Sequence, residues 1–117
     1  AGWSVSRQRG EGDLVTYMDW IRSCRVIVTC DSLGMHLGLA MHRYVIALFG
    51  PTPSDQVHLY GRGVIVKAAG VCDEAPCFRP ACRHRMPGAC MRAVAPHAVM
   101  AHIDEGLSAP VRVARCA

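Results

Sequence analysis

Two short apolar runs without alternating polar residues constrain the fold of this chain more than any other feature. Residues 25–30 and 44–49 are rich in Val and Ile, and each run ends at turn-forming residues, an Asp-Ser pair and a Gly-Pro pair. Continuous apolar runs of this length are typical of parallel strands covered on both faces. Parallel strands need a crossover connection, usually a helix. The two runs therefore predict a strand-helix-strand unit.

Helix signals lie before and between the two runs. In residues 14–21 the apolar positions recur at helical spacing, and Asp13 precedes them in the position of an N-cap. Residues 33–42 have the length of a second helix, which either Asp31 or Ser32 caps. The chain thus begins with the order helix, strand, helix, strand.

The second half of the chain continues this order less regularly. Residues 64–67 predict a shorter third strand, and residues 71–91 read as an irregular cysteine-rich loop. A last helix begins at Pro96 and carries an apolar stripe to Leu107. Strands that alternate with helices predict an α/β fold, part of a Rossmann-like parallel sheet with flanking helices.

Length and composition favour a single packed unit. The chain has 117 residues, of which 51% are apolar and 19% charged, the balance of a globular domain. We expect a loop at residues 1–13, one domain at 14–107 and a tail at 108–117. The strongest apolar stretch, residues 44–49, is far shorter than the roughly 20 residues of a membrane span, and no signal peptide is recognisable. The sequence is therefore expected to be soluble and cytoplasmic.

The turn after the first strand carries candidate binding chemistry. The carboxyl edge of an open α/β sheet is where such folds bind ligands, and free N–H groups at a helix start suit a phosphate. Ser32 adds a hydroxyl, His36 can donate to a phosphate oxygen, and the Asp31 carboxylate suits sugar hydroxyls. The alternative is that Asp31 and Ser32 only cap the helix and His36 is an ordinary helical histidine.

Residues 28–37 and 45–52 resemble the signature of glycosyltransferase family 9, the lipopolysaccharide heptosyltransferases. The resemblance continues through the cysteine-rich stretch from Cys72 to Met91 and the helix that begins at Pro96. It implies the carboxyl-terminal, donor-binding part of a GT-B fold. It also implies transfer of heptose, with inversion, from ADP-heptose to a lipid A-linked core, without a metal cofactor.

The resemblance assigns roles residue by residue. Asp31 matches the acidic residue that contacts the donor sugar, Ser32 the hydroxyl beside the donor phosphates, and His36 the family histidine. Leu33 stands where most members have glycine, and Gly34 follows one position later. The implied partners are a nucleotide-sugar donor like ADP-heptose and a lipopolysaccharide-core or lipid A-type acceptor. The acceptor half with the catalytic base lies outside this sequence, so we expect the chain alone to be inactive. The implied location is cytoplasmic, either free or peripheral at the inner membrane.

Four of the seven cysteines form a block. Cys72, Cys77, Cys82 and Cys90 are separated by four, four and seven residues. Four thiolates can hold a structural zinc ion, although the spacing is not that of a standard zinc ribbon. The alternatives are reduced cysteines packed as small hydrophobes, or disulfides that form on isolation.

Two alternatives to a glycosyltransferase part remain, and the positive charge of the chain supports one of them. The net charge is +4, and Arg79, Arg83, Arg85 and Arg92 surround the cysteine block, so a basic cysteine-knuckle module could bind nucleic acid or a protein. Nucleic acid is disfavoured because aromatic residues make up only 6% of the chain and only Phe78 lies among these arginines. The third reading is an inactive remnant.

Overall fold

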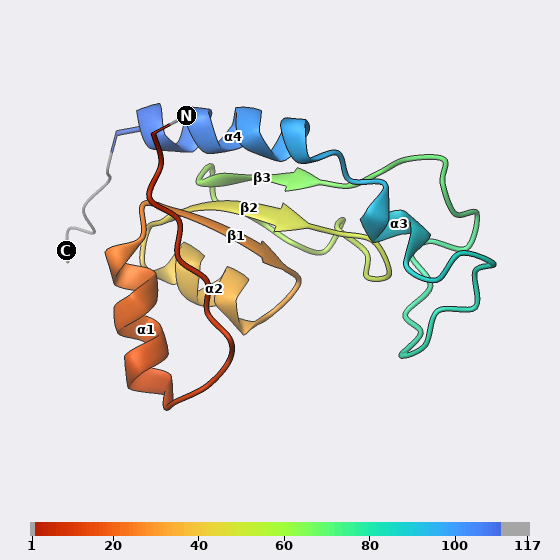
Figure 1. The fold of residues 1–117 in the computed structure, drawn as a ribbon, viewed down its shortest axis with the longest axis horizontal. Coiled ribbons are helices and arrows are strands. Elements are labelled where there is room, and N and C mark those ends of the chain that lie inside the picture. The colour runs from red at the N-terminus through yellow and green to blue at the C-terminus, as the bar shows by residue number, and fades with distance from the viewer. Residues whose placement is uncertain (1, 111–117) are drawn as a thin grey trace.

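A computed structural model describes residues 2–110. The elements follow the predicted order (Figure 1). They are α1 (Leu14–Ser23), β1 (Val26–Cys30), α2 (Leu33–Ala40), β2 (Tyr44–Leu48), β3 (Gly63–Val66), α3 (Ala89–Arg92) and α4 (Pro96–Ser108). Each predicted helix and strand is present, with ends that differ by one or two residues. Helix α2 ends at Ala40 rather than at His42, because His42 takes a left-handed backbone conformation, with φ of 59°.

The three strands form one parallel sheet in the order β1-β2-β3. Figure 1 shows α1 and α2 on one side of this sheet and α4 on the other. The predicted α/β class, a Rossmann-like parallel sheet with flanking helices, is confirmed. Val26 pairs with Tyr44, and Val45 pairs with Gly63, so the strands begin close to the same level and end at a common carboxyl edge.

The core lies mainly between the sheet and the two helices α1 and α2. Its buried members are apolar residues of both layers: Ile21, Ile27, Met35, Leu39, Val45, Ala47 and Phe49. Helix α4 approaches the other face of the sheet closely, because Gly106 has no side chain where the Tyr44 ring and Val26 lie. The strands are thus held by helices on both sides, and the carboxyl end of β2 packs against Cys90 and Met91 of α3.

Strand β1 is less covered than its apolar sequence predicts. All of Val45, Ile46 and Ala47 in β2 are fully buried, whereas Val28 in β1 is 45% exposed. The reason is position, since β1 is the edge strand of the described sheet. Residues 2–13, which contain no helix or strand, run past this edge (Figure 1). We call residues 2–13 the arm. Two side-chain hydrogen bonds hold it against the rest of the chain, one from Trp3 to Asp104 and one from Trp20 to Ser6.

The cysteine-rich segment extends beyond the carboxyl ends of the strands (Figure 1). It is irregular as predicted, except that its end forms the short helix α3, which the sequence pattern did not reveal. Of the predicted tail, residues 111–117 lie outside the described residues. None of the helices in residues 2–110 combines the length and the apolar character that a membrane crossing requires.

Candidate functional site

The residues of the predicted site lie at the carboxyl end of β1. Strand β1 ends at Cys30 and α2 begins at Leu33, so Asp31 and Ser32 form the whole connection. Asp31 is exposed and forms no ion pair with the other described residues. Its carboxylate is therefore available to accept hydrogen bonds from a ligand.

Ser32 occupies the N-cap position of α2 but does not cap the helix through its side chain. Its Oγ lies 2.9 Å from Oγ1 of Thr29, the neighbouring hydroxyl on β1. The first backbone bonds of α2 run from the N–H groups of Met35 and His36 to the Ser32 carbonyl. The N–H groups of Leu33 and Gly34 precede these bonds and are left without the usual serine acceptor. Ser32 therefore holds the N-cap position, but its side chain does not cap α2 as the alternative interpretation of the sequence predicts.

Leu33 and Gly34 have different surroundings. The Leu33 side chain is 57% exposed, so it lies beside the turn rather than in the core. Gly34 is buried, and a methyl group there would overlap the Tyr17 hydroxyl of α1. The absence of a side chain at Gly34 thus lets the Tyr17 hydroxyl of α1 lie close to the start of α2.

His36 lies on the exposed flank of α2 and lines a hollow of about 490 Å³ with Val57, His58 and Tyr60. These residues come from the loop between β2 and β3. The Tyr60 N–H donates to Nδ1 of His58 at 3.0 Å, and the two rings meet edge to face, 4.6 Å apart. Neutral His58 therefore carries its proton on Nε2. His36 thus lines the same hollow as the His58 and Tyr60 rings. The contact of His36 with a donor phosphate stays a prediction.

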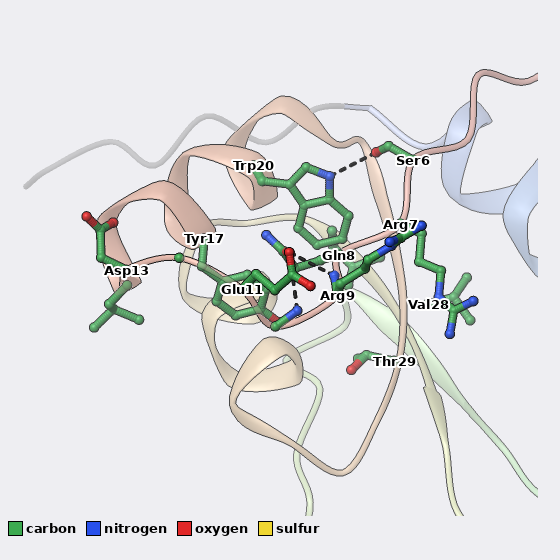
Figure 2. A pocket seen from close by; sticks show the side chains of 14 residues that line it. Ser6, Arg7, Gln8, Arg9, Glu11, Asp13, Tyr17, Trp20, Val28 and Thr29 are labelled. Carbon is green, nitrogen blue, oxygen red and sulfur yellow. Dashed lines mark hydrogen bonds between the residues drawn. The ribbon is translucent and has the colours of Figure 1, made fainter.

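A hollow of about 690 Å³ lies between the arm, α1 and β1, and sequence reasoning missed it. Figure 2 shows side chains of the arm, among them Arg7, Arg9 and Glu11, around the same hollow as Tyr17 and Trp20 of α1 and Thr29 of β1. The Tyr17 and Trp20 rings stack at 6.0 Å. Thr29, which lines this hollow, also contacts Ser32 at the start of α2. Its arm residues show no periodicity, so no sequence signal indicated a role.

The structure does not assemble the four-cysteine ligand set that was considered for zinc. Across residues 2–110, no three His, Cys, Asp or Glu side chains are grouped to hold a metal ion. Cys72 and Cys90 line one hollow, while Sγ of Cys82 accepts the Gly88 N–H at 3.3 Å. This bond, followed by that of the His84 N–H, lowers the pKa of Cys82. Structural zinc stays a prediction that metal counting on purified protein tests.

The arginines of the cysteine-rich segment form a weaker cationic surface than the sequence suggests. Arg79 contacts the Glu74 carboxylate at 2.6 Å, and Phe78 is 68% exposed beside it. An ion pair of this kind reduces the charge available to a phosphate backbone.

A parallel sheet flanked by helices, with a strand-to-helix turn at its carboxyl edge, defines the Rossmann-like class of α/β folds. The family model of glycosyltransferase family 9 (heptosyltransferase) matches residues 9–86, more than half of the chain. The chain belongs to glycosyltransferase family 9, and the resemblance seen in the sequence is confirmed. Neither a curated protein nor a solved structure matches the chain significantly.

Proposed function

We propose that this chain binds the diphosphate of a nucleotide sugar at the start of α2, as the donor-binding part of a heptosyltransferase. The donor resembles ADP-heptose, and the acceptor is a lipopolysaccharide core or a lipid A-type glycolipid bound by another domain. Membership of family 9 supports glycosyl transfer. The observation that carries the proposed binding mode is the contact between Ser32 and Thr29, which leaves the first N–H groups of α2 without a side-chain acceptor.

The chemistry of this turn suits a diphosphate. The N–H groups of Leu33 and Gly34 and the positive end of the helix dipole attract a phosphate oxygen. The Thr29 hydroxyl donates to the Cys30 carbonyl at 3.2 Å, so the Ser32 hydroxyl donates to Thr29 when no ligand is bound. On donor binding, the Ser32 hydrogen turns to a phosphate oxygen while its Oγ stays beside Thr29. Arg7 and Arg9, which form no ion pair with a described carboxylate, add positive charge across the hollow beside β1.

Asp31 supports the placement of the sugar. A carboxylate repels a phosphate laid directly on it but accepts hydrogen bonds from the hydroxyl groups of a sugar. Asp31 precedes the N-cap residue by one position, so the sugar would lie beside the phosphates at the exposed end of β1. This arrangement orients the donor and requires no metal ion.

The catalytic base belongs, on this proposal, to the acceptor-binding domain. The chain by itself then binds the donor without turning it over. We place the assembled enzyme in the cytoplasm, where it works either free or at the inner membrane surface.

Calorimetric titration of the chain with ADP-heptose tests the proposal. We expect saturable binding that weakens about fivefold or more in Asp31→Ala and Ser32→Ala, the loss of one hydrogen bond or more. Asp19→Asn is the matched control, because Asp19 is an exposed carboxylate on α1 that contacts only Arg22 among the described residues. Absence of binding, or equal binding in all variants, would contradict the proposal. Salt-sensitive binding of single-stranded oligonucleotides instead would favour the basic-module reading.

A further inference from the structure

The amino edge of the sheet, opposite the Asp31 turn, gathers three arginines. Arg25, Arg43 and Arg62 each immediately precede a strand, β1, β2 and β3 respectively. The Tyr44 N–H bonds the Arg25 carbonyl, and the Val45 N–H bonds the Arg62 carbonyl. Because neighbouring strands lie about 4.8 Å apart, this register brings the three residues together at one end of the sheet.

Two of these side chains are held by helix ends. Nη2 of Arg25 donates to the Leu107 carbonyl of α4 at 2.7 Å, and Nη1 of Arg62 donates to the Leu39 carbonyl of α2 at 3.3 Å. Cations at helix carboxyl termini are favourable. These bonds fix the guanidinium groups in place but occupy only part of their donors.

The remaining donors point to a missing acceptor. Nε of Arg43, Nε of Arg62 and Nδ1 of His42 are buried and have no hydrogen-bond partner in the described part of the chain. Each buried polar atom without a hydrogen-bond partner costs about 1–3 kcal/mol, so three of them call for an explanation. These residues line a small hollow of about 140 Å³ together with Arg25 and Tyr44.

Negative charge near this hollow is scarce. None of the three arginines forms an ion pair with a carboxylate within residues 2–110. Glu105 of α4 reaches Tyr44, where burial and then the Glu105 charge raise the pKa of the phenol, and it also contacts His102. The hollow itself is lined by no Asp or Glu. Clustered like charges repel one another, so an anion there would be attracted strongly.

The backbone conformation at His42 also favours a binding site for an anion at this hollow. The N–H groups of His42 and Arg43 bond the carbonyls of Leu39 and Gly38, which is the Schellman ending of a helix. His42 holds the left-handed position, with φ of 59°, where glycine would avoid a cost of about 1–2 kcal/mol. The strained position places an imidazole, rather than a hydrogen atom, at the wall of the hollow.

We propose that this amino-edge hollow binds a phosphate-type oxyanion, held by Arg43, Arg62 and His42. Its size suits a single phosphate group, and guanidinium groups form charge-assisted hydrogen bonds with phosphate oxygens. The site is separate from the donor turn, which lies at the other end of the strands. The phosphate belongs either to a free small molecule or to the headgroup of a lipid.

Titration of the full chain with inorganic phosphate, followed by NMR of the arginine Nε–H groups, tests this proposal. We expect saturable shifts of the Arg43 and Arg62 signals at about millimolar concentration or below. Arg43→Gln and Arg62→Gln should each weaken binding about tenfold, as expected for loss of a charge-assisted bond. Arg22→Gln is the control, because Arg22 is exposed and paired with Asp19. The absence of saturable shifts, or equal binding in all variants, would overturn the proposal and leave the hollow to water.

Two further measurements keep the result interpretable. Arg43→Lys retains the charge but lacks the Nε–H, so weaker phosphate binding in a folded Arg43→Lys protein excludes a mere folding defect. Sedimentation with phosphatidylcholine vesicles that contain phosphatidic acid distinguishes the two sources of phosphate. Arg43-dependent sedimentation indicates a lipid headgroup, whereas binding of free phosphate alone indicates a soluble ligand. Affinity for ADP-heptose should be unchanged in Arg43→Gln, which separates this site from the proposed donor site.

Discussion

The hydroxyl groups of Ser32 and Thr29 face each other across the carboxyl end of β1, with their Oγ atoms 2.9 Å apart. This contact holds the side chain of an N-cap residue away from its own helix. An N-cap serine ordinarily accepts a hydrogen bond from the second or third helical N–H. Here the Met35 N–H bonds the Ser32 carbonyl, and the Gly34 N–H has no side-chain acceptor and remains free for a ligand. The contact thus links the local conformation of the turn to its proposed function.

Thr29→Val should weaken donor binding. Without the Thr29 hydroxyl, the Ser32 side chain can turn to its own helix and accept the N–H groups that the diphosphate needs. The loss of one such bond is worth about 1 kcal/mol, or about fivefold in the dissociation constant for ADP-heptose. Thr29→Ser keeps the hydroxyl and should bind as the parent does. Equal affinities of all three proteins in calorimetry would show that the contact has no role.

Gly34→Ala should destabilise the fold, and Tyr17→Phe should partly restore it. A methyl group at Gly34 overlaps the Tyr17 hydroxyl, and such overpacking typically costs about 1–3 kcal/mol. Removing the hydroxyl makes room for the methyl group. Urea unfolding of the two single variants and the double variant measures the coupling. Additive free energies of unfolding would contradict the close contact between α1 and α2.

The Asp13 cap should make the stability of α1 depend on pH. The Thr16 N–H, which bonds the Asp13 carboxylate at 2.8 Å, lowers the pKa of Asp13. The stabilisation by the ionised cap is therefore complete above the ordinary carboxyl pKa of about 3.9. It is lost as pH falls through the lower pKa of the folded state.

Asp13→Asn provides the comparison, since asparagine also caps helices but does not titrate in this range. The urea midpoint of the parent should exceed that of Asp13→Asn at neutral pH, and the difference should vanish in acid. A difference that does not change with pH would contradict the cap.

Cys82 should be the first cysteine in the described residues to react with iodoacetamide. It is exposed, and the Gly88 N–H, followed by the His84 N–H, lowers its pKa, so more of it is thiolate at a given pH. Peptide mass spectrometry after brief alkylation measures the order of modification. Cys30 is the matched comparison, because it is also exposed. Faster labelling of Cys30 would argue against the Gly88 bond to sulfur.

His42→Gly should raise the free energy of unfolding by about 1 kcal/mol, because glycine accepts the left-handed backbone at the end of α2 without strain. The same change removes an imidazole from the amino-edge hollow and should weaken phosphate binding. For this one variant, the free energy of unfolding should thus rise while the affinity for phosphate falls, as chemical unfolding and phosphate titration can measure. A loss of stability would mean that the imidazole packing outweighs the backbone strain.

The order of elements, the parallel sheet and the position of the Asp31-Ser32 turn could be predicted from the sequence because their signals are local. Apolar runs, helical spacing and the Asp31-Ser32 turn are properties of neighbouring residues, and the family signature lies in continuous stretches. The exposure of Val28 was not predictable in this way, since an apolar strand reads the same at the edge of a sheet as at its centre. Helix α3 was hidden because it is too short to show a period.

Only the tertiary structure decided which distant segments of the chain lie next to one another. Arg25, Arg43 and Arg62 are separated by 18 and 19 residues in the chain, and only the register of the parallel strands brings them to one edge. Likewise, packing of the loop on α2 places His36 beside His58. Strand register and layer packing arise from the whole core rather than from local preference. The sequence by itself thus determined the helices, the strands and the Asp31-Ser32 turn, and the tertiary structure decided which charges meet at the opposite edge of the sheet.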